Sequence, residues 1–384
     1  MKLYQSKIPS CTYGGQGSLN QVAGILSAEK AQRVIVFTDQ GVRGAGLLDP
    51  LTDLLQNAGV PYTVFDQLKA EPSYQDVDAL MQQVGQETGS LIIALGGGSV
   101  MDTAKLCAAL QGAPYTTKDL LGSPGKAKKQ MKSIMIPTTC GTGSEATCNA
   151  IVAVPEDGVK VGIVNDCLIP DYVILDPEMI RGLPAPIIAA TGVDALAHAV
   201  ECYTSLKANP LSDVYAMASA KLIFQNIRAA YSQPEHMEAK SNMLIGAFYG
   251  GAAITASGTT AVHALSYPLG GKYHIAHGVS NAILFAHVMA FNKDACEGRL
   301  AQICDAIRPD LCGQPEAERA RFVIDEIADI VRFTNIPTNL AQYGVTAADL
   351  DFLTDAGSKV TRLLDNNCKK LSLDDIRAIY RKVL

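Results

Sequence analysis

The stretch "ALGGGSVMDTAKLCAAL", residues 94–110, predicts the fold of the first half of the chain. Its residues are typical of a buried strand, a glycine turn and a helix that begins at or near Ser99. Gly97 and Gly98 lack the side chains that would keep a phosphate away from the amides of a helix N-terminus. A tight strand-to-helix turn without a ligand explains the glycines about as well, because their spacing is not GxGxxG.

Short strand-like runs alternate with helical stretches on both sides of residues 94–110. Strands are predicted at 33–39, 61–65, 90–98, 132–139 and 171–177, and helices at 46–59 and 73–86. This alternation predicts a mostly parallel sheet covered by helices. From residue 184 onward helical spacing dominates, as at 213–230 and 319–333, and nothing there convincingly predicts a strand. We therefore expect an α/β domain at 1–180 and an all-helical domain at 181–384.

Composition narrows the classes of function. The 384 residues are 48% apolar and 18% charged, which is enough for a large core. A net charge of −6 with scattered Lys and Arg argues against binding to nucleic acid or to an anionic membrane. The start "MKLYQSKIPSC" has no apolar leader, no segment approaches the ~20 apolar residues that span a bilayer, and the ten cysteines form no CxxC pair. We expect a cytoplasmic protein with reduced thiols and a small-molecule ligand.

A second polar turn, "PTTCGTGSE" at 137–145, follows the next predicted strand. Its hydroxyls belong to Thr138, Thr139, Thr142 and Ser144. Two such turns at the carboxyl ends of parallel strands form the usual nucleotide site of an open α/β sheet. Asp39 closes the strand at 33–39, where a carboxylate accepts hydrogen bonds from ribose hydroxyls and repels a 2′-phosphate. A helix cap or turn aspartate is the alternative for this position.

The segment "TGVDALAHAVECYTS" at 191–205 carries Asp194 and His198 on one face of a predicted helix, one turn apart. A buried Asp–His hydrogen bond is the simplest explanation. However, four of the six histidines fall within 262–287. If "PLGGKY" at 268–273 is a turn between two helices, His263 and His277 could fold toward each other. Together with the first pair they would offer one carboxylate and three imidazoles to a divalent metal, with Fe²⁺ and Zn²⁺ both open.

In order and separation, four motifs resemble those of the iron-containing, group III alcohol dehydrogenases. They are "GGGSVMDTAK", "PTTCGTGSEAT", "LPAPIIAATGVDALAHAVECYTS" and "AVHALSYPLGGKYHIAHGVSNAILFAHVMAFN". The resemblance covers essentially the whole chain and implies a Rossmann-like NAD domain followed by a helical metal-binding domain. It implies metal ligands at Asp194, His198, His263 and His277, a pyrophosphate loop at Gly97, Gly98 and Ser99, and further cofactor contacts at Thr138, Thr139, Thr142, Thr147 and Lys160. Asp39 matches the family position associated with preference for NAD.

The chain departs from the family pattern at informative places. Glu71 stands where many members have Asn, and Tyr267 stands where many have a further histidine. Tyr267 lies four residues after His263, so on a helix it would share the face that points at the metal. We expect it to reach the substrate or the nicotinamide ribose; packing before Pro268 is the alternative. His274 is a further candidate for the substrate pocket.

These observations predict an NAD-linked, metal-dependent dehydrogenase that interconverts a small primary alcohol or diol and its aldehyde. Fe²⁺ is the favoured metal, with Zn²⁺ as the alternative, and a homodimer or higher homo-oligomer is expected. A glycerol-type polyol dehydrogenase with zinc is a second hypothesis. A dehydroquinate-synthase-like lyase would need basic residues for an anionic substrate, and 191–290 offers few: Lys207, Lys221, Arg228, Lys240 and Lys272.

Overall fold

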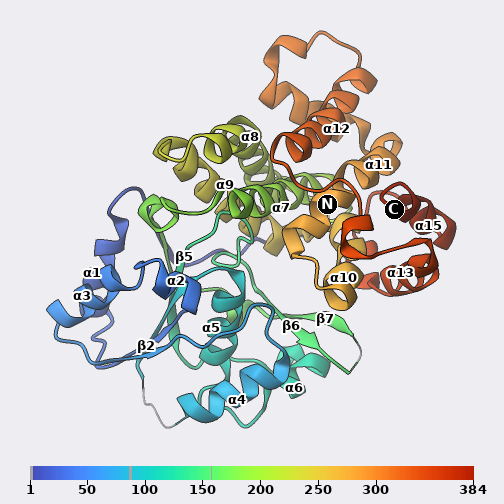
Figure 1. The fold of residues 1–384 in the computed structure, drawn as a ribbon. Helices are drawn as coiled ribbons and strands as arrows, with labels where there is room; N and C mark the ends of the chain where they lie inside the picture. The colour runs from blue at the N-terminus through green and yellow to red at the C-terminus, as the bar shows by residue number, and fades with distance from the viewer. Residues whose placement is uncertain (1–2, 86–88, 157) are drawn as a thin grey trace. The chain divides into compact units, whose positions relative to one another are not determined.

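The computed structural model describes residues 3–85, 89–156 and 158–384. The chain divides into two compact units. The first, here called the α/β unit, comprises Lys7–Thr139 and Gly143–Leu183, and the second, the helical unit, comprises Met1–Ser6, Cys140–Thr142 and Pro184–Leu384. The predicted fold class, a parallel α/β sheet and an all-helical part, is confirmed (Figure 1).

A six-stranded parallel sheet forms the centre of the α/β unit, in the order β1-β8-β5-β4-β2-β3. The strands are β1 (Cys11–Gly14), β2 (Val34–Phe37), β3 (Tyr62–Phe65), β4 (Leu91–Gly96), β5 (Lys132–Pro137) and β8 (Tyr172–Leu175). The five strands predicted from the sequence are all present. The sequence analysis missed β1, whose four residues include neither Val nor Ile and are not buried.

Helices cover both faces of this sheet (Figure 1). Leu91, Ile93 and Leu95 of β4 pack with α1 (Gln21–Ala28) and α3 (Asp49–Asn57). Ile92 and Ala94, which point the opposite way, pack with α4 (Tyr74–Val84) and α5 (Gly98–Leu110). Strand side chains alternate between faces, so a strand buried on both sides is a continuous apolar run. The shorter elements are η1 (Ser18–Asn20), α2 (Gln40–Gly44), α6 (Thr117–Gly122), η2 (Pro124–Lys126), η3 (Asp166–Leu168) and η4 (Pro177–Ile180).

The antiparallel hairpin of β6 (Asn149–Val154) and β7 (Val159–Val164) was not predicted. Small residues such as Ala150, Ala153 and Gly162 weaken its β propensity. Ala150 and Val152 pack against Leu106 and Ala109 of α5. Because α5 is covered by the sheet on one side and by the hairpin on the other, its residues 100–110 are all buried.

The described residues of the helical unit form helices and no strand. Its helices are α7 (Ala185–Thr204), α8 (Pro210–Ser232), α9 (Met237–Ser257), α10 (Ala261–Tyr273), α11 (His277–Ile307), η5 (Pro309–Leu311), α12 (Glu316–Phe333), η6 (Ala341–Tyr343), η7 (Ala347–Asp349), α13 (Leu350–Ser358), α14 (Thr361–Leu364) and α15 (Leu373–Arg381). The turn predicted at 268–273 is wrong, because α10 continues through the buried Pro268 to Tyr273. Tertiary packing overrides the low helix propensity of proline here, and the chain reverses instead at residues 274–276.

Helix α7 corrects a second expectation. By length and composition its 20 residues could cross a membrane, although the sequence analysis found no such segment. In the structure 72% of the most apolar 18-residue stretch of this helix is buried. The helix packs on α8, α9 and α11. It also carries Asp194, His198 and Glu201, all buried. These properties are typical of a core helix rather than a membrane span.

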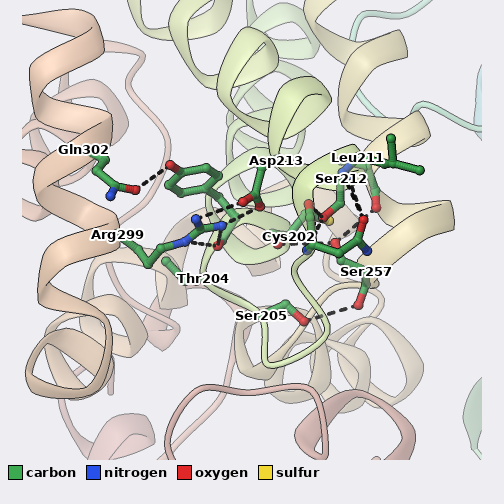
Figure 2. Close-up of polar contacts among 12 residues, drawn as sticks. Cys202, Thr204, Ser205, Leu211, Ser212, Asp213, Ser257, Arg299 and Gln302 are labelled. Atoms are coloured by element: carbon green, nitrogen blue, oxygen red, sulfur yellow. Dashed lines mark hydrogen bonds and ion pairs between the residues drawn. The ribbon is translucent and has the colours of Figure 1, made fainter. Parts of the chain in front are cut away.

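The C-terminal end of α7 is fixed by Arg299 of α11 (Figure 2). Its guanidinium donates hydrogen bonds of 2.9 and 2.7 Å to the backbone oxygen of Tyr203. The same group lies 3.6 Å from the centre of the Tyr203 ring and pairs with Asp213 of α8. The last carbonyls of a helix lack partners within the helix and favour a cation. Arg299 therefore ties three helices together at one point.

The three-residue segment Cys140–Thr142 leaves the α/β unit between β5 and β6 and belongs to the helical unit. A Cβ atom on Gly141 would lie 2.5 Å from the Cβ of Thr191 on α7. Such a distance is too short for two carbon atoms, so only glycine fits at this position.

A buried polar cluster joins α5 to the segment before β6. The Nζ of Lys105 lies 3.2 Å from Asp102 and 3.0 Å from the hydroxyl of Thr147, and Asp102 accepts a 2.9 Å hydrogen bond from the amide of Ile151. Glu145 is 1% exposed beside this cluster. Burial raises the pKa of Glu145 to about 7, and its Oε1 has no hydrogen-bond partner among the described residues.

Glu145→Gln should remove a pH dependence of stability. The folded-state pKa lies above the unfolded value, so wild-type stability falls as pH rises from about 4.5 to about 7. The variant should match the wild type near pH 4 and gain up to about 3 kcal/mol relative to it near pH 8. Urea unfolding followed by circular dichroism measures both. The exposed Glu318→Gln is the matched control, and an equal effect of Glu145→Gln at both pH values would contradict the assignment.

Candidate functional site

Four side chains of the helical unit converge. Asp194 and His198 come from α7, His263 from α10 and His277 from the first position of α11. Oδ1 of Asp194 lies 3.8, 3.5 and 3.6 Å from the Nε2 atoms of His198, His263 and His277. One ligand atom of each residue lies within 4.8 Å of all the others. The structure thus brings together the four residues for which the sequence predicted a metal site.

The approach of α11 to α7 depends on Gly278. A Cβ atom there would lie 2.2 Å from the backbone oxygen of Ala190, so a side chain would push the two helices apart. His274 ends α10 with a left-handed backbone, φ 54°. The chain can therefore reverse in three residues and place His277 directly at the start of the next helix.

The cluster is electrostatically suited to a cation. Burial alone would raise the pKa of Asp194, but His198, His277 and His263 together hold it well below its usual range. Burial lowers the pKa of His198 to about 4, which leaves a neutral imidazole. Burial would also lower the pKa of His263, but Glu201 and Asp194 raise it to about 9. A buried carboxylate surrounded by imidazole nitrogens is a donor set that a divalent transition metal satisfies.

Glu201, a residue that the sequence analysis did not assign, holds His263 in place. It lies on α7 and is 0% exposed. Its Oε1 accepts hydrogen bonds from the amide and hydroxyl of Thr260, at 3.1 and 2.7 Å, and from the amide of Val262, at 2.8 Å. Its Oε2 pairs with Nδ1 of His263. A carboxylate on the far nitrogen fixes the orientation of a metal-binding imidazole, so Nε2 of His263 faces the cluster.

Asn281 was also missed. Its amide nitrogen lies 2.6 Å from Oδ1 of Asp194, 3.1 Å from Nε2 of His263 and 3.3 Å from Nε2 of His277. Its Oδ1 is buried and has no hydrogen-bond partner among the described residues. An amide can present either its nitrogen or its oxygen. The spacing alone could have identified it, because it lies one turn after His277.

Tyr267 and His274 lie in different surroundings. The ring of Tyr267 is 6.2 Å from that of His277, centre to centre, as the shared helix face predicts. Burial raises the pKa of Tyr267, so its phenol is neutral near pH 7. His274 is exposed at the end of α10 and is not one of the four converging residues.

The glycine turn of the α/β unit fits a phosphate. Gly97 precedes α5 without a side-chain hydrogen bond to the amides of the first turn, and Gly98 and Ser99 follow as its first residues. The hydroxyl of Thr139, at the end of β5, is buried and unpartnered among the described residues. A Cβ atom added to Gly97 would lie 3.7 Å from the oxygen of this hydroxyl. Amides of a helix N-terminus beside an unused hydroxyl are suitable donors for an anion.

Other predicted cofactor residues already have partners within the α/β unit. The Thr147 hydroxyl accepts from Lys105. Lys160 of β7 pairs with Glu71 at 2.6 Å, whose amide in turn donates to the Ser99 hydroxyl at 3.0 Å.

Three more residues complete the predicted set. Thr138 is buried and donates its amide to Gly96 at 3.1 Å. Thr142 is half-buried in the segment Cys140–Thr142. Asp39 caps α2 by accepting from the amide of Val42 at 2.9 Å, so the cap alternative weighed for this position is present.

A parallel α/β unit followed by a helical unit with a largely buried Asp–His₃ cluster is typical of metal-dependent oxidoreductases. The family model of the iron-containing alcohol dehydrogenases matches residues 9–177, and the model of the C-terminal part of the Fe-containing alcohol dehydrogenase family matches 188–384. The chain therefore belongs to the iron-containing alcohol dehydrogenase family. It is an alcohol-oxidising or aldehyde-reducing enzyme that works with NAD and a divalent metal.

Individual relatives agree with this assignment. Long-chain-alcohol dehydrogenase 1 of Geobacillus thermodenitrificans is 34% identical over 99% of this chain and 96% of its own. A crystal structure of 1,3-propanediol oxidoreductase superposes with a TM-score of 0.93 at 28% identity, covering 100% of both chains. The sulfoacetaldehyde reductase of Bifidobacterium kashiwanohense, solved in complex with NAD⁺, gives a TM-score of 0.89 at 27% identity, covering 100% of this chain and 99% of its own.

Glu201→Gln should weaken metal binding. The amide keeps the size of the side chain but removes the charge that orients His263, and loss of such a partner lowers metal affinity by about 10- to 100-fold. Titration of metal-depleted protein with Fe²⁺ or Zn²⁺, followed by calorimetry, measures the change. Glu297→Gln, at a partly exposed position of α11 that pairs with Lys293, is the matched control. Equal affinity in the Glu201 variant and the wild type would show that Glu201 serves only to hold α10.

Proposed function

We propose that Asp194, His198, His263 and His277 bind the divalent metal, with Fe²⁺ favoured and Zn²⁺ as the alternative. The convergence of their four ligand atoms within 4.8 Å carries this proposal. Residues 1–180 would bind NAD, with Gly97, Gly98 and Ser99 at the pyrophosphate, and residues 181–384 would hold the metal and the substrate. The Thr139 hydroxyl, which has no hydrogen-bond partner among the described residues, supports the cofactor assignment.

When bound, the metal supplies a Lewis acid for the substrate oxygen and NAD supplies the hydride acceptor or donor. The contribution of the chain is then largely orientation and charge. Asp194 would offset the metal's positive charge, and Glu201 holds His263 in the orientation that would bind it. Tyr267, beside His277, can donate or accept a hydrogen bond at the substrate, but its raised pKa excludes it as a base near neutral pH.

The proposed substrate is a small primary alcohol or diol and the corresponding aldehyde. Relatives are named for long-chain alcohols, 1,3-propanediol and sulfoacetaldehyde, which share a primary alcohol or aldehyde carbon. The glycerol-type polyol dehydrogenase and the lyase have no comparable support.

A homo-oligomer in the cytoplasm is part of the same proposal. Leu206, Leu211 and Val214, close together in sequence around the start of α8, are 61%, 43% and 66% exposed. Exposed apolar residues grouped in this way favour contact with a second subunit. A monomer in light scattering would contradict this part.

His277→Ala should lose bound metal and lower kcat/KM at least about 100-fold, because it removes one of four ligands. NAD binding should persist, since the proposed cofactor residues at 97–99 and Thr139 belong to the α/β unit. Elemental analysis, NADH fluorescence titration and aldehyde reduction measure the three properties.

Tyr267→Phe serves as the comparison for His277→Ala. It keeps the neighbouring ring, so it should retain the metal while kcat falls about tenfold. Full activity of metal-free His277→Ala would overturn the proposal.

Asp39→Asn should raise the efficiency with NADPH relative to NADH by about tenfold or more. The amide can still cap α2, but the negative charge that would repel a 2′-phosphate is gone. The ratio of kcat/KM for the two cofactors is the measurement, and Asp49→Asn, at the start of α3, is the control. An unchanged ratio in a folded variant would leave Asp39 a helix cap only.

A further inference from the structure

Two cysteines that take no part in the proposed reaction lie next to each other in the helical unit. All ten cysteines of the chain are free. Cys296 is 4% exposed and lies where α11 departs from helical geometry, with φ −133° and ψ 24°. Cys368 is half-buried between α14 and α15. The two side chains are close enough for each thiol to affect the pKa of the other.

Contacts on both sides of Cys368 hold it against α11. Asn367 and Asn292 exchange two amide hydrogen bonds, at 2.9 and 2.8 Å, and both side chains are buried. The Nζ of Lys369 contacts Asp294 at 2.9 Å and the backbone oxygen of Phe291 at 3.2 Å. Asn367 and Lys369 therefore hold the segment around Cys368 against the part of α11 that directly precedes Cys296.

The two thiols have unequal surroundings. The hydrogen bond from Cys296 lowers the pKa of Cys368, whereas the hydrogen bond with Cys368 and burial raise the pKa of Cys296. The Sγ of Cys296 also lies 3.3 Å from the backbone oxygen of Asn292. Thiolate character and access determine which cysteine reacts with an oxidant. Access therefore favours the half-buried Cys368, rather than Cys296 with its 4% exposure, as the thiol that meets an oxidant first.

We propose that Cys296 and Cys368 form a reversible redox pair, which a peroxide converts into a disulfide between α11 and the segment before α15. The Cys368 sulfur attacks one peroxide oxygen and breaks the O–O bond. With hydrogen peroxide this gives a sulfenic acid and, with the Cys368 proton, one water. The Cys296 sulfur then displaces the hydroxyl from Cys368, and this hydroxyl leaves with the Cys296 proton as a second water. Two thiols are oxidised and one peroxide is reduced.

The disulfide would lie close in sequence to a contact with the metal site. Asn366, two residues before Cys368, donates a 3.0 Å hydrogen bond to the backbone oxygen of Thr259. Thr260, the next residue, binds Glu201, the carboxylate that orients His263. The start of α10 is already held by Glu201 of α7. A disulfide that fixed the 366–369 segment to α11 would therefore constrain it through Asn366 as well.

The test is peptide mapping of the intact enzyme under non-reducing conditions after exposure to hydrogen peroxide. We expect a linked pair of peptides containing Cys296 and Cys368, lighter by two hydrogens than their sum and separated again by dithiothreitol. Before oxidation, iodoacetamide should label Cys368 faster than the buried Cys107. This readout requires neither metal nor activity, so it is independent of the proposed function.

Two variants complete the design. Cys368→Ser should abolish the linked pair, whereas Cys312→Ser, which changes an exposed cysteine elsewhere, should leave it intact. The proposal is overturned if wild-type protein gives no linked pair while Cys312 is oxidised. Oxidation of Cys368 to the sulfinic acid without capture by Cys296 would overturn it equally.

Discussion

Burying the carboxylate of Glu201 would cost several kcal/mol without compensation. Two amides, one hydroxyl and an imidazole compensate it, and all four come from residues 260–263. Because Glu201 lies on α7, these bonds determine where α10 begins relative to α7 and which nitrogen of His263 points toward Asp194. The geometry of the candidate metal centre therefore depends on a residue that would not itself touch the metal.

The helix that carries this carboxylate is fixed at its end as well as along its length. Arg299 binds the last turn of α7 and Asp213 of α8, while Gly278 allows α11 to approach Ala190. In the α/β unit Lys105 plays a comparable part, since it joins α5 to Thr147 and Asn149. In both units, buried or partly buried charged side chains bind backbone groups near the functional residues and limit their movement.

The sequence predicted those features that depend on local pattern. Continuous apolar runs identified the five central strands, and the glycine turn located the start of α5. Asp194, His198, His263 and His277 were found from helical spacing, clustering and family resemblance. Glu201 was missed because an acid on a helix face does not reveal whether it is buried, whereas Asn281 could have been found from its position one turn after His277. The partners of Glu201 lie about 60 positions further along the chain, and only the packing of α10 on α7 brings them together.

The segment Cys140–Thr142 has a consequence for folding during synthesis. The α/β unit emerges from the ribosome first, but the connection between β5 and β6 packs on α7 at Thr191. About 50 further residues must be made before that partner exists, which takes several seconds at typical translation rates. Until then the connection that leads from the parallel sheet to the β6–β7 hairpin has no partner for Gly141. Thr139, which directly precedes this connection, is therefore fully confined only after the helical unit has begun to fold.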